Sequence, residues 1–253
     1  MPTALITGAS AGLGAEFARQ LAARGADLVL VARSTEALKE LAEELRGRYD
    51  VAVEVRTADL TQTRGVNRIA ERLADTERPI DLLVNNAGFG LPLHFANNDV
   101  ADEVDHLRIH VEAPLRLTHA ALGAMRGRGG RIVNVASVAA FLPRSTYGAC
   151  KQWLVGFSEW ANAEYARDRV SVTAVCPGFT HTSFHERMGL SAGEEGVASF
   201  LWLDAEAVVR EALRDAARGR AVSVPSLRYK ALVALSRFVP RSLLARAGRQ
   251  GRV

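Results

Sequence analysis

The sequence predicts a doubly wound α/β domain, with a mostly parallel seven-stranded sheet and helices on both faces. Three observations support this fold class. A chain of 253 residues with 48% hydrophobic and 24% charged residues suits one globular domain with a large core. Short runs rich in Val, Ile and Leu alternate with longer stretches of helical period. These short runs are largely apolar and do not alternate regularly with polar residues, as expected for parallel strands buried on both faces.

The expected strands and helices follow one another along the whole domain. The strands are predicted at 3–7, 27–32, 51–56, 80–84, 131–136, 170–175 and 221–224. The helices are predicted at 13–24, 35–48, 62–75, 99–126, 147–167 and 205–218. In the first helix, Leu13, Phe17 and Leu21 recur every four residues and so share one face.

The domain is expected to cover residues 1–225, followed by a C-terminal extension at 226–253. Inside the domain, residues 184–204 combine glycines with large apolar side chains, which favours a flap over a substrate pocket. The extension has the pattern of two short basic amphipathic helices divided by Pro240. We favour packing of this tail on the domain or on another subunit, and attachment to an anionic membrane surface is the alternative.

Composition excludes several classes of protein. Two cysteines, Cys150 and Cys176, cannot form a disulfide framework or a four-ligand zinc site, and we assign them no chemistry. No leader pattern or long apolar run is visible, so a cytoplasmic location is expected. Nine of the 32 basic residues follow residue 215 without any acid, so the basic charge belongs to the tail. Because this tail lacks interleaved aromatic residues, no nucleic-acid partner is expected.

A glycine-rich loop, Thr7 to Gly14, follows the first strand and opens the first helix. Gly8 permits a tight turn, Gly12 lets the backbone approach a phosphate, and Gly14 allows the helix to pack closely on the strand. The N–H groups of the helix N-terminus can then bind a pyrophosphate. At this place in the chain, the loop predicts a dinucleotide site.

The end of the second strand indicates which dinucleotide binds. An NAD site usually has an acidic residue there to hold the ribose 2′-hydroxyl, whereas this strand ends in Ala32-Arg33-Ser34. Arg33 can form a planar fork with a 2′-phosphate, with assistance from Ser34. NADP(H) is therefore favoured over NAD(H), and a solvated surface arginine is the alternative interpretation of Arg33.

Polar residues that can carry chemistry follow two later strands. Asn85-Asn86-Ala87-Gly88 ends the fourth strand, and Ser137 ends the fifth. Tyr147 and Lys151 follow at the start of a helix, four residues apart and therefore on one face. Since the carboxyl ends of strands in such sheets bind ligands, these residues are candidates for one site.

Taken in this order, the motifs resemble those of the short-chain dehydrogenase/reductase family. The resemblance extends to about residue 225 and also includes Asp59-Leu60 and the segment Pro177–Thr182. It implies a Rossmann fold and an NADP-dependent enzyme that reduces a ketone or aldehyde to the alcohol. It also implies a small-molecule carbonyl/alcohol substrate and a homodimer or homotetramer.

The resemblance assigns a role to each candidate residue. Tyr147 would be the general acid/base, Lys151 would lower its pKa by about 1–3 units, and Ser137 would donate to the substrate oxygen. The implied cofactor contacts are Gly8, Ser10, Gly12, Leu13, Gly14, Arg33, Ser34, Asp59, Leu60, Asn86, Ala87, Gly88, Tyr147, Lys151, Pro177, Gly178, Thr180 and Thr182. No metal ligand is implied.

The chain departs from the family pattern at two places. Alignment of residues 107–114 with the long helix of the family puts His110 where an asparagine is usual, and we leave His110 outside the predicted site. Ser137 and Tyr147 are ten positions apart, a few fewer than usual, which admits Ser145 as a rival to Ser137. The shortened loop should reshape the substrate pocket.

The substrate is predicted only as a class. Large apolar side chains favour an apolar or acyl-bearing ketone. The candidates for the pocket wall are Phe89, Phe141, Leu142, Met188, Phe200 and Trp202. A catalytically weak NADP(H)-binding regulator or scaffold is the alternative function, and the intact Ser137, Tyr147 and Lys151 set argues against it.

Overall fold

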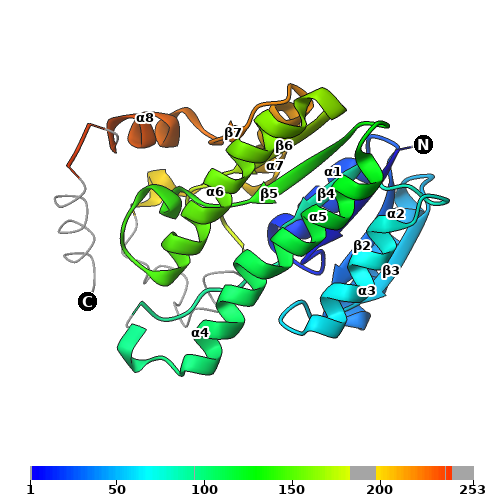
Figure 1. Cartoon of the computed structure of the whole chain (residues 1–253), viewed down its shortest axis with the longest axis horizontal. Coiled ribbons are helices and arrows are strands. Elements are labelled where there is room, and N and C mark those ends of the chain that lie inside the picture. Colours follow the sequence, from blue (N-terminus) through cyan, green and yellow to red (C-terminus); the bar gives the residue numbers. More distant parts are fainter. Residues whose placement is uncertain (1, 94, 183–197, 237, 241–253) are drawn as a thin grey trace.

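The computed structural model describes residues 2–93, 95–182, 198–236 and 238–240. A parallel seven-stranded sheet runs through the molecule in the order β3-β2-β1-β4-β5-β6-β7 (Figure 1). The strands are β1 (Thr3–Thr7), β2 (Asp27–Ala32), β3 (Val53–Thr57), β4 (Leu82–Asn85), β5 (Gly130–Val135), β6 (Val170–Val175) and β7 (Val222–Ser223). The predicted doubly wound fold is confirmed, and the strand order reverses direction between β1 and β4.

All six helices predicted within the domain are present, with outer ends within three residues of those expected. The helices are α1 (Gly12–Ala22), α2 (Thr35–Arg48), α3 (Thr63–Ala74), α4 (Val100–Leu107), α5 (Ala113–Met125), α6 (Thr146–Glu164), α7 (Ala205–Ala217) and α8 (Leu227–Ser236). The single helix expected at 99–126 is divided by a π-helical turn, Arg108–Glu112. Pro114 has no N–H to donate to the carbonyl of residue 110, which removes one α-helical bond at this turn.

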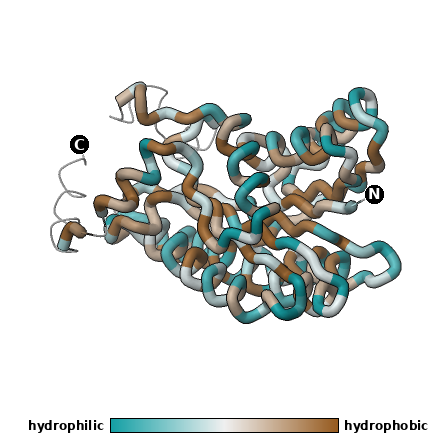
Figure 2. Tube along the Cα trace, turned by 90° about the horizontal axis from the view of Figure 1, so that it is seen from above, coloured by the Kyte–Doolittle hydropathy of each residue, from teal (hydrophilic) through white to brown (hydrophobic). Residues whose placement is uncertain are grey.

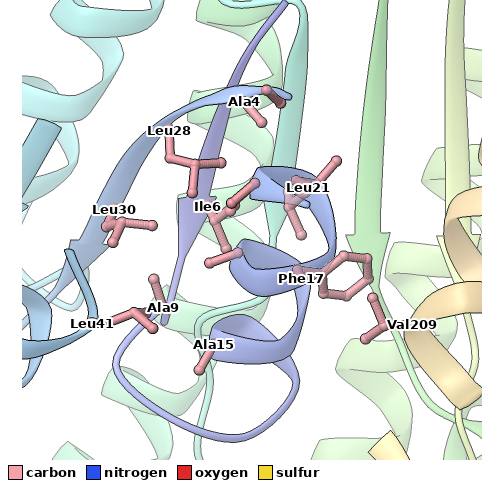
Figure 3. Packing of buried hydrophobic residues seen from close by; sticks show 14 of the residues in the cluster. Ala4, Ile6, Ala9, Ala15, Phe17, Leu21, Leu28, Leu30, Leu41 and Val209 are labelled. Carbon is pink, nitrogen blue, oxygen red and sulfur yellow. The ribbon is translucent and has the colours of Figure 1, made fainter. Parts of the chain in front are cut away.

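Helices cover both faces of the sheet and enclose separate apolar clusters. One cluster joins α1, α2 and α7 to the sheet, and the opposite cluster joins α3, α5 and the end of α6. In the first, Phe17 of α1 is fully buried and lies between the strands and Val209 of α7 (Figure 3). Figure 2 shows the same arrangement, with hydrophobic residues concentrated in the central strands and hydrophilic residues on the outer helices. Burial of one such side chain stabilises the fold by about 1.5–3 kcal/mol.

A buried hydrogen-bond chain fixes the centre of the sheet against two helices. The Asn85 amide donates to Asn134 Oδ1 at 2.9 Å and to Thr118 Oγ1 at 3.2 Å. The Asn134 amide donates in turn to Ser158 Oγ at 2.9 Å. Because paired polar groups inside a core allow few alternative arrangements, this chain holds β4, β5, α5 and α6 in one register.

The first part of the C-terminal extension packs on the domain through α8. Tyr229 and Val233 are buried in a third apolar cluster with residues of α6 and β6. The second helix expected in the extension and residues 184–197 of the expected flap lie outside the described residues. Among the helices that are described, none has the length and hydropathy needed to cross a membrane.

Candidate active site

The glycine loop forms a close-fitting cradle between β1 and α1. Gly8 and Gly12 have φ angles of +66° and +55°, which L-residues with side chains rarely adopt. A Cβ atom on Gly14 would lie 2.1 Å from the Gly8 carbonyl oxygen. The loop therefore needs glycine at these positions, and it presents backbone rather than side chains at the N-terminus of α1.

The segment after β4 secures this loop. Thr7 Oγ1 accepts from the backbone N–H groups of Asn86 and Ala87 at 2.9 and 3.0 Å. The Asn86 amide donates to the carbonyls of Thr7 and Gly8 at 3.0 and 3.2 Å. Asn86 is also a predicted cofactor contact, and its side chain fixes the shape of the glycine turn.

The loops after β2 and β3 place the expected adenosine contacts at the same edge. Arg33 is exposed at the end of β2. Ser34 caps α2 by accepting from the Ala37 N–H at 3.3 Å, and its hydroxyl proton can still be donated. Asp59 accepts from the backbone and the hydroxyl of Thr61 at 3.0 and 2.9 Å, which fixes a local turn. Leu60, by contrast, is buried in an apolar cluster.

The loop after β6 closes on the glycine loop and is held by α8. A Cβ on Gly12 would touch Thr182 at 3.3 Å, so the two loops are adjacent. The Tyr229 ring occupies the space beside Gly178, where a Cβ would lie 2.0 Å from it. The Tyr229 hydroxyl donates to the Leu201 carbonyl at 2.9 Å and accepts from the Phe179 N–H at 3.1 Å. Nothing in the sequence pattern pointed to Tyr229.

Ser137, Tyr147 and Lys151 come together at the carboxyl edge of β5. The Ser137 and Tyr147 side chains are hydrogen-bonded to each other. Lys151 Nζ lies 5.5 Å from the centre of the Tyr147 ring and donates to the Val135 carbonyl at 2.6 Å. The rival Ser145 is used as the N-cap of α6, where it accepts from the Gly148 N–H at 3.1 Å. The geometry therefore favours Ser137.

Burial dominates the electrostatics of this set. It raises the pKa of the Tyr147 phenol, although the hydrogen bond from Ser137 acts in the opposite direction. It lowers the pKa of Lys151 from 10.5 to about 8, because the residue is only 4% exposed. The expected lowering of the Tyr147 pKa by Lys151 is not seen in this structure, where the lysine donates to the Val135 carbonyl.

Two histidines that the sequence analysis left out lie against Tyr147. The His110 ring centre is 5.3 Å from that of Tyr147, and the His106 ring centre is 5.9 Å from it. A Cβ on Gly88 would lie 2.3 Å from His110 Cε1, so the last glycine of the Asn-Asn-Ala-Gly motif leaves room for this imidazole. The helical spacing of 106 and 110 could have indicated the pair, since both face one side of the helix.

A cavity of about 310 Å³ opens next to Tyr147. Its wall comes from the segment after β4 and from the short loop before α6. The lining residues are Leu91, Pro92, Leu93, Phe95, Ala96, Asn97, Glu103, Arg144, Ser145, Thr146 and Tyr147. None of the wall candidates among the described residues lines it: Phe200 and Leu142 are exposed, and Phe89 packs against His106. Met188 lies outside the described residues.

The glycine cradle at the strand-order reversal, together with the Ser–Tyr–Lys set beside it, defines an NAD(P)(H)-dependent oxidoreductase. Comparison with known proteins supports this class of enzyme. A family model described as short chain dehydrogenase matches residues 2–191. The chain belongs to the short-chain dehydrogenase/reductase family.

The matches to named proteins and to solved structures cover most of the chain. Oxidoreductase UcpA of Salmonella typhimurium is 35% identical over 218 residues, which are 84% of this chain and 82% of that protein. A short-chain dehydrogenase from Sphingobium yanoikuyae in complex with NADPH has a TM-score of 0.85 and 34% identity, with 94% of each chain covered. The bulky-bulky ketone specific alcohol dehydrogenase from Comamonas testosteroni has a TM-score of 0.80 and 32% identity, with coverage of 94% and 93%.

Proposed function

We propose that this protein catalyses NADPH-dependent reduction of a ketone or aldehyde to the alcohol. The observation that carries the proposal is the Tyr147 phenol, which is hydrogen-bonded to Ser137, lies over buried Lys151 and faces a cavity of about 310 Å³. Such a cavity is large enough to hold a small carbonyl substrate. The complex of the Sphingobium relative with NADPH supports the choice of cofactor.

The residues fit a dinucleotide and divide the chemistry among them. The Gly8–Gly14 cradle and the adjacent Thr182 would hold the pyrophosphate, and a side chain on Gly8 or Gly14 would clash with the protein atoms that shape this cradle. When bound, the nicotinamide supplies a hydride to the carbonyl carbon. Tyr147 donates its phenolic proton to the carbonyl oxygen, where negative charge develops, and the Ser137 hydroxyl donates a hydrogen bond to that oxygen. To stabilise the phenolate that remains, the Lys151 ammonium would turn from the Val135 carbonyl toward Tyr147, whose ring centre lies 5.5 Å away.

The pocket supports an apolar carbonyl substrate with a polar end. Leu91, Pro92 and Leu93 provide apolar wall, and Glu103 with Arg144 places charge on the same surface. The Comamonas relative acts on bulky-bulky ketones according to its name. We therefore propose a ketone with sizeable apolar or acyl groups as the substrate. A screen of ketones and aldehydes with NADPH tests this, and NADPH binding without turnover would instead favour the regulatory or scaffold protein.

Arg33 is proposed to select NADP(H) over NAD(H). Replacing Arg33 by alanine removes a guanidinium fork at the end of β2, and we expect the KM for NADPH to rise about tenfold or more. The KM for NADH should stay within about twofold, since NADH has no 2′-phosphate. Steady-state kinetics with both cofactors measure the ratio. Arg24→Ala, on an exposed arginine after α1, is the control, and an equal change with both cofactors would contradict the assignment.

We also propose that the protein is a homodimer formed through α6. Trp153 and Phe157 stack at 4.9 Å, and Trp160 is 53% exposed beside them. A row of half-buried aromatic side chains that ends in an exposed tryptophan suits the centre of an interface. Trp160→Glu should halve the mass measured by light scattering, whereas Leu227→Glu on exposed α8 should leave it unchanged. A monomeric wild-type protein would disprove the proposal.

A further inference from the structure

Glu103, His106 and His110 form a column along one side of α4 and the π turn. Their spacing of three and four residues places them on one helix face. Glu103 lines the cavity, and its Oε1 accepts from the Asn98 amide at 2.8 Å. The ring centres of His106 and His110 are 4.4 Å apart, and His110 reaches Tyr147. The column therefore leads from the pocket wall to the phenol.

The hydrogen bond of His110 fixes its tautomer. Its Nε2 lies 2.8 Å from the Phe89 carbonyl oxygen, which can only accept, so Nε2 carries the proton. Nδ1 of the neutral ring then holds a lone pair, and it has no hydrogen-bond partner among the residues that the structure describes. His110 is thus prepared to accept one more proton, at Nδ1.

The burial of His106 has no structural explanation in its hydrogen bonds among the described residues, unlike that of His110. It is 1% exposed, and neither of its ring nitrogens has a hydrogen-bond partner within the described part of the chain. Leaving a buried polar group unpaired costs about 1–3 kcal/mol, a cost that phenylalanine or leucine would avoid. The ring also lies on the helix segment that leads into the π turn, a feature often found at functional sites.

We propose that the His106–His110 pair carries the proton that restores Tyr147 after each reduction, with Glu103 as its entry from the pocket. The inference rests on the proposed function, because it assumes that Tyr147 donates a proton during turnover. It makes His106 and His110 positioning and relay residues, whereas Tyr147 remains the group that touches the substrate.

The proton balance closes within each turnover. Tyr147 loses one proton to the carbonyl oxygen and becomes a phenolate. The histidine pair takes up one proton from solvent through Glu103 and passes it to that phenolate across a gap that one water or a small ring movement can bridge. One proton leaves solvent for each alcohol formed, and the histidines return to their neutral state.

The charged surroundings keep the pair neutral at rest. Glu103 of α4 favours a charged His106, whereas Lys151 of α6 disfavours charge on both rings. Tyr147 of α6 lies against both rings, and Cys150 of α6 and Cys176 after β6 act electrostatically on Tyr147 and Lys151. Burial lowers the pKa of His106 to about 4 and also lowers that of His110 well below its usual value. A phenolate at Tyr147 adds a negative charge beside the rings, so protonation becomes favourable only during turnover.

Kinetics of His106→Phe test the relay. Phenylalanine preserves the ring but cannot carry a proton, so kcat should fall about tenfold with the KM for NADPH within twofold. The solvent deuterium isotope effect on kcat should rise, because proton return becomes rate-limiting. His119→Phe, at an exposed position of α5, is the matched control and should change neither quantity. A His106→Phe enzyme with wild-type kcat, pH profile and isotope effect would overturn the proposal.

Chemical rescue separates a relay from simple packing. His106→Ala should lose activity in the same way and regain part of it when 4-methylimidazole is added, whereas His106→Phe has no space for the added base and should not respond. An inactive His106→Ala that no imidazole restores, with an unchanged isotope effect, would show that the ring only fills space.

Histidine ¹⁵N NMR supplies a test that needs no turnover. At pH 7 both rings should be neutral, with His110 protonated at Nε2. A stable imidazolium at position 106 would contradict the relay. If wild-type protein reduces no carbonyl compound, the proposed function fails, and the NMR result still decides whether the pair has the protonation state that the relay needs.

Discussion

Tyr147→Phe should lower NADPH-dependent carbonyl reduction by about 10²- to 10⁴-fold, the range that a general acid contributes. The phenol is hydrogen-bonded to Ser137 and lines the pocket, so its removal leaves no proton donor at this place in the site. NADPH affinity should change little, because the glycine cradle is untouched. Stopped-flow reduction and fluorescence titration of NADPH measure the two effects separately.

Tyr165→Phe is the matched control for this substitution. Tyr165 packs against Trp160 at the end of α6, remote from the cavity lining, so removal of its hydroxyl should leave kcat unchanged. A Tyr147→Phe enzyme that keeps wild-type kcat on its best substrate would disprove the proposed mechanism. Retained binding with lost turnover would confirm that the phenol acts in the chemical step.

The main features of the fold could be predicted because they depend on local pattern. Buried parallel strands are apolar on both faces, so β1, β2 and β6 stand out with their exact or nearly exact ends. Gly8, Gly12 and Gly14 could be predicted because their conformations and close contacts exclude side chains. The π turn was missed, since its cause is one proline whose effect depends on which carbonyl its missing N–H would have met.

The parts of the site that were missed depend on contacts between distant segments. Leu91, Pro92 and Leu93 match no recognisable sequence motif. They line the pocket only because the loop before α6 lies opposite them in the folded chain. Tyr229 is separated from Gly178 by about fifty residues in the sequence. Its ring occupies the space that a side chain at position 178 would need, so glycine is required at that position. Burial also reversed the expected direction of the Tyr147 pKa shift, and burial is a property of the folded chain.

Lys151→Met should abolish reduction and, at the same time, remove a pH-dependent penalty on folding. Burial holds the pKa of Lys151 at about 8 in the folded protein, against 10.5 for an unfolded chain. Below pH 8 the ammonium is charged in both states, so the folded state bears the full penalty of about 3 kcal/mol. Between pH 8 and 10.5 the unfolded chain binds the additional proton, so the stability of the wild type rises relative to that of the variant.

The test is the difference in unfolding free energy between wild type and Lys151→Met, measured with urea at pH 7 and pH 10. The free energy of unfolding of the wild type should rise relative to that of Lys151→Met by about 2.5 kcal/mol between these pH values. The hydrogen bond from Lys151 Nζ to the Val135 carbonyl adds a constant difference in stability between the two proteins. Because a neutral amine can still donate this bond, the constant does not change with pH and the expected trend remains. Lys39→Met, on the exposed face of α2, should show no such trend. If the difference in unfolding free energy between wild type and Lys151→Met does not change with pH, the lysine keeps its ordinary pKa and a partner offsets its burial. The expected rise in relative stability with pH would instead show that the buried ammonium destabilises the folded protein. The lysine at position 151 would then be required for the reaction and not for folding.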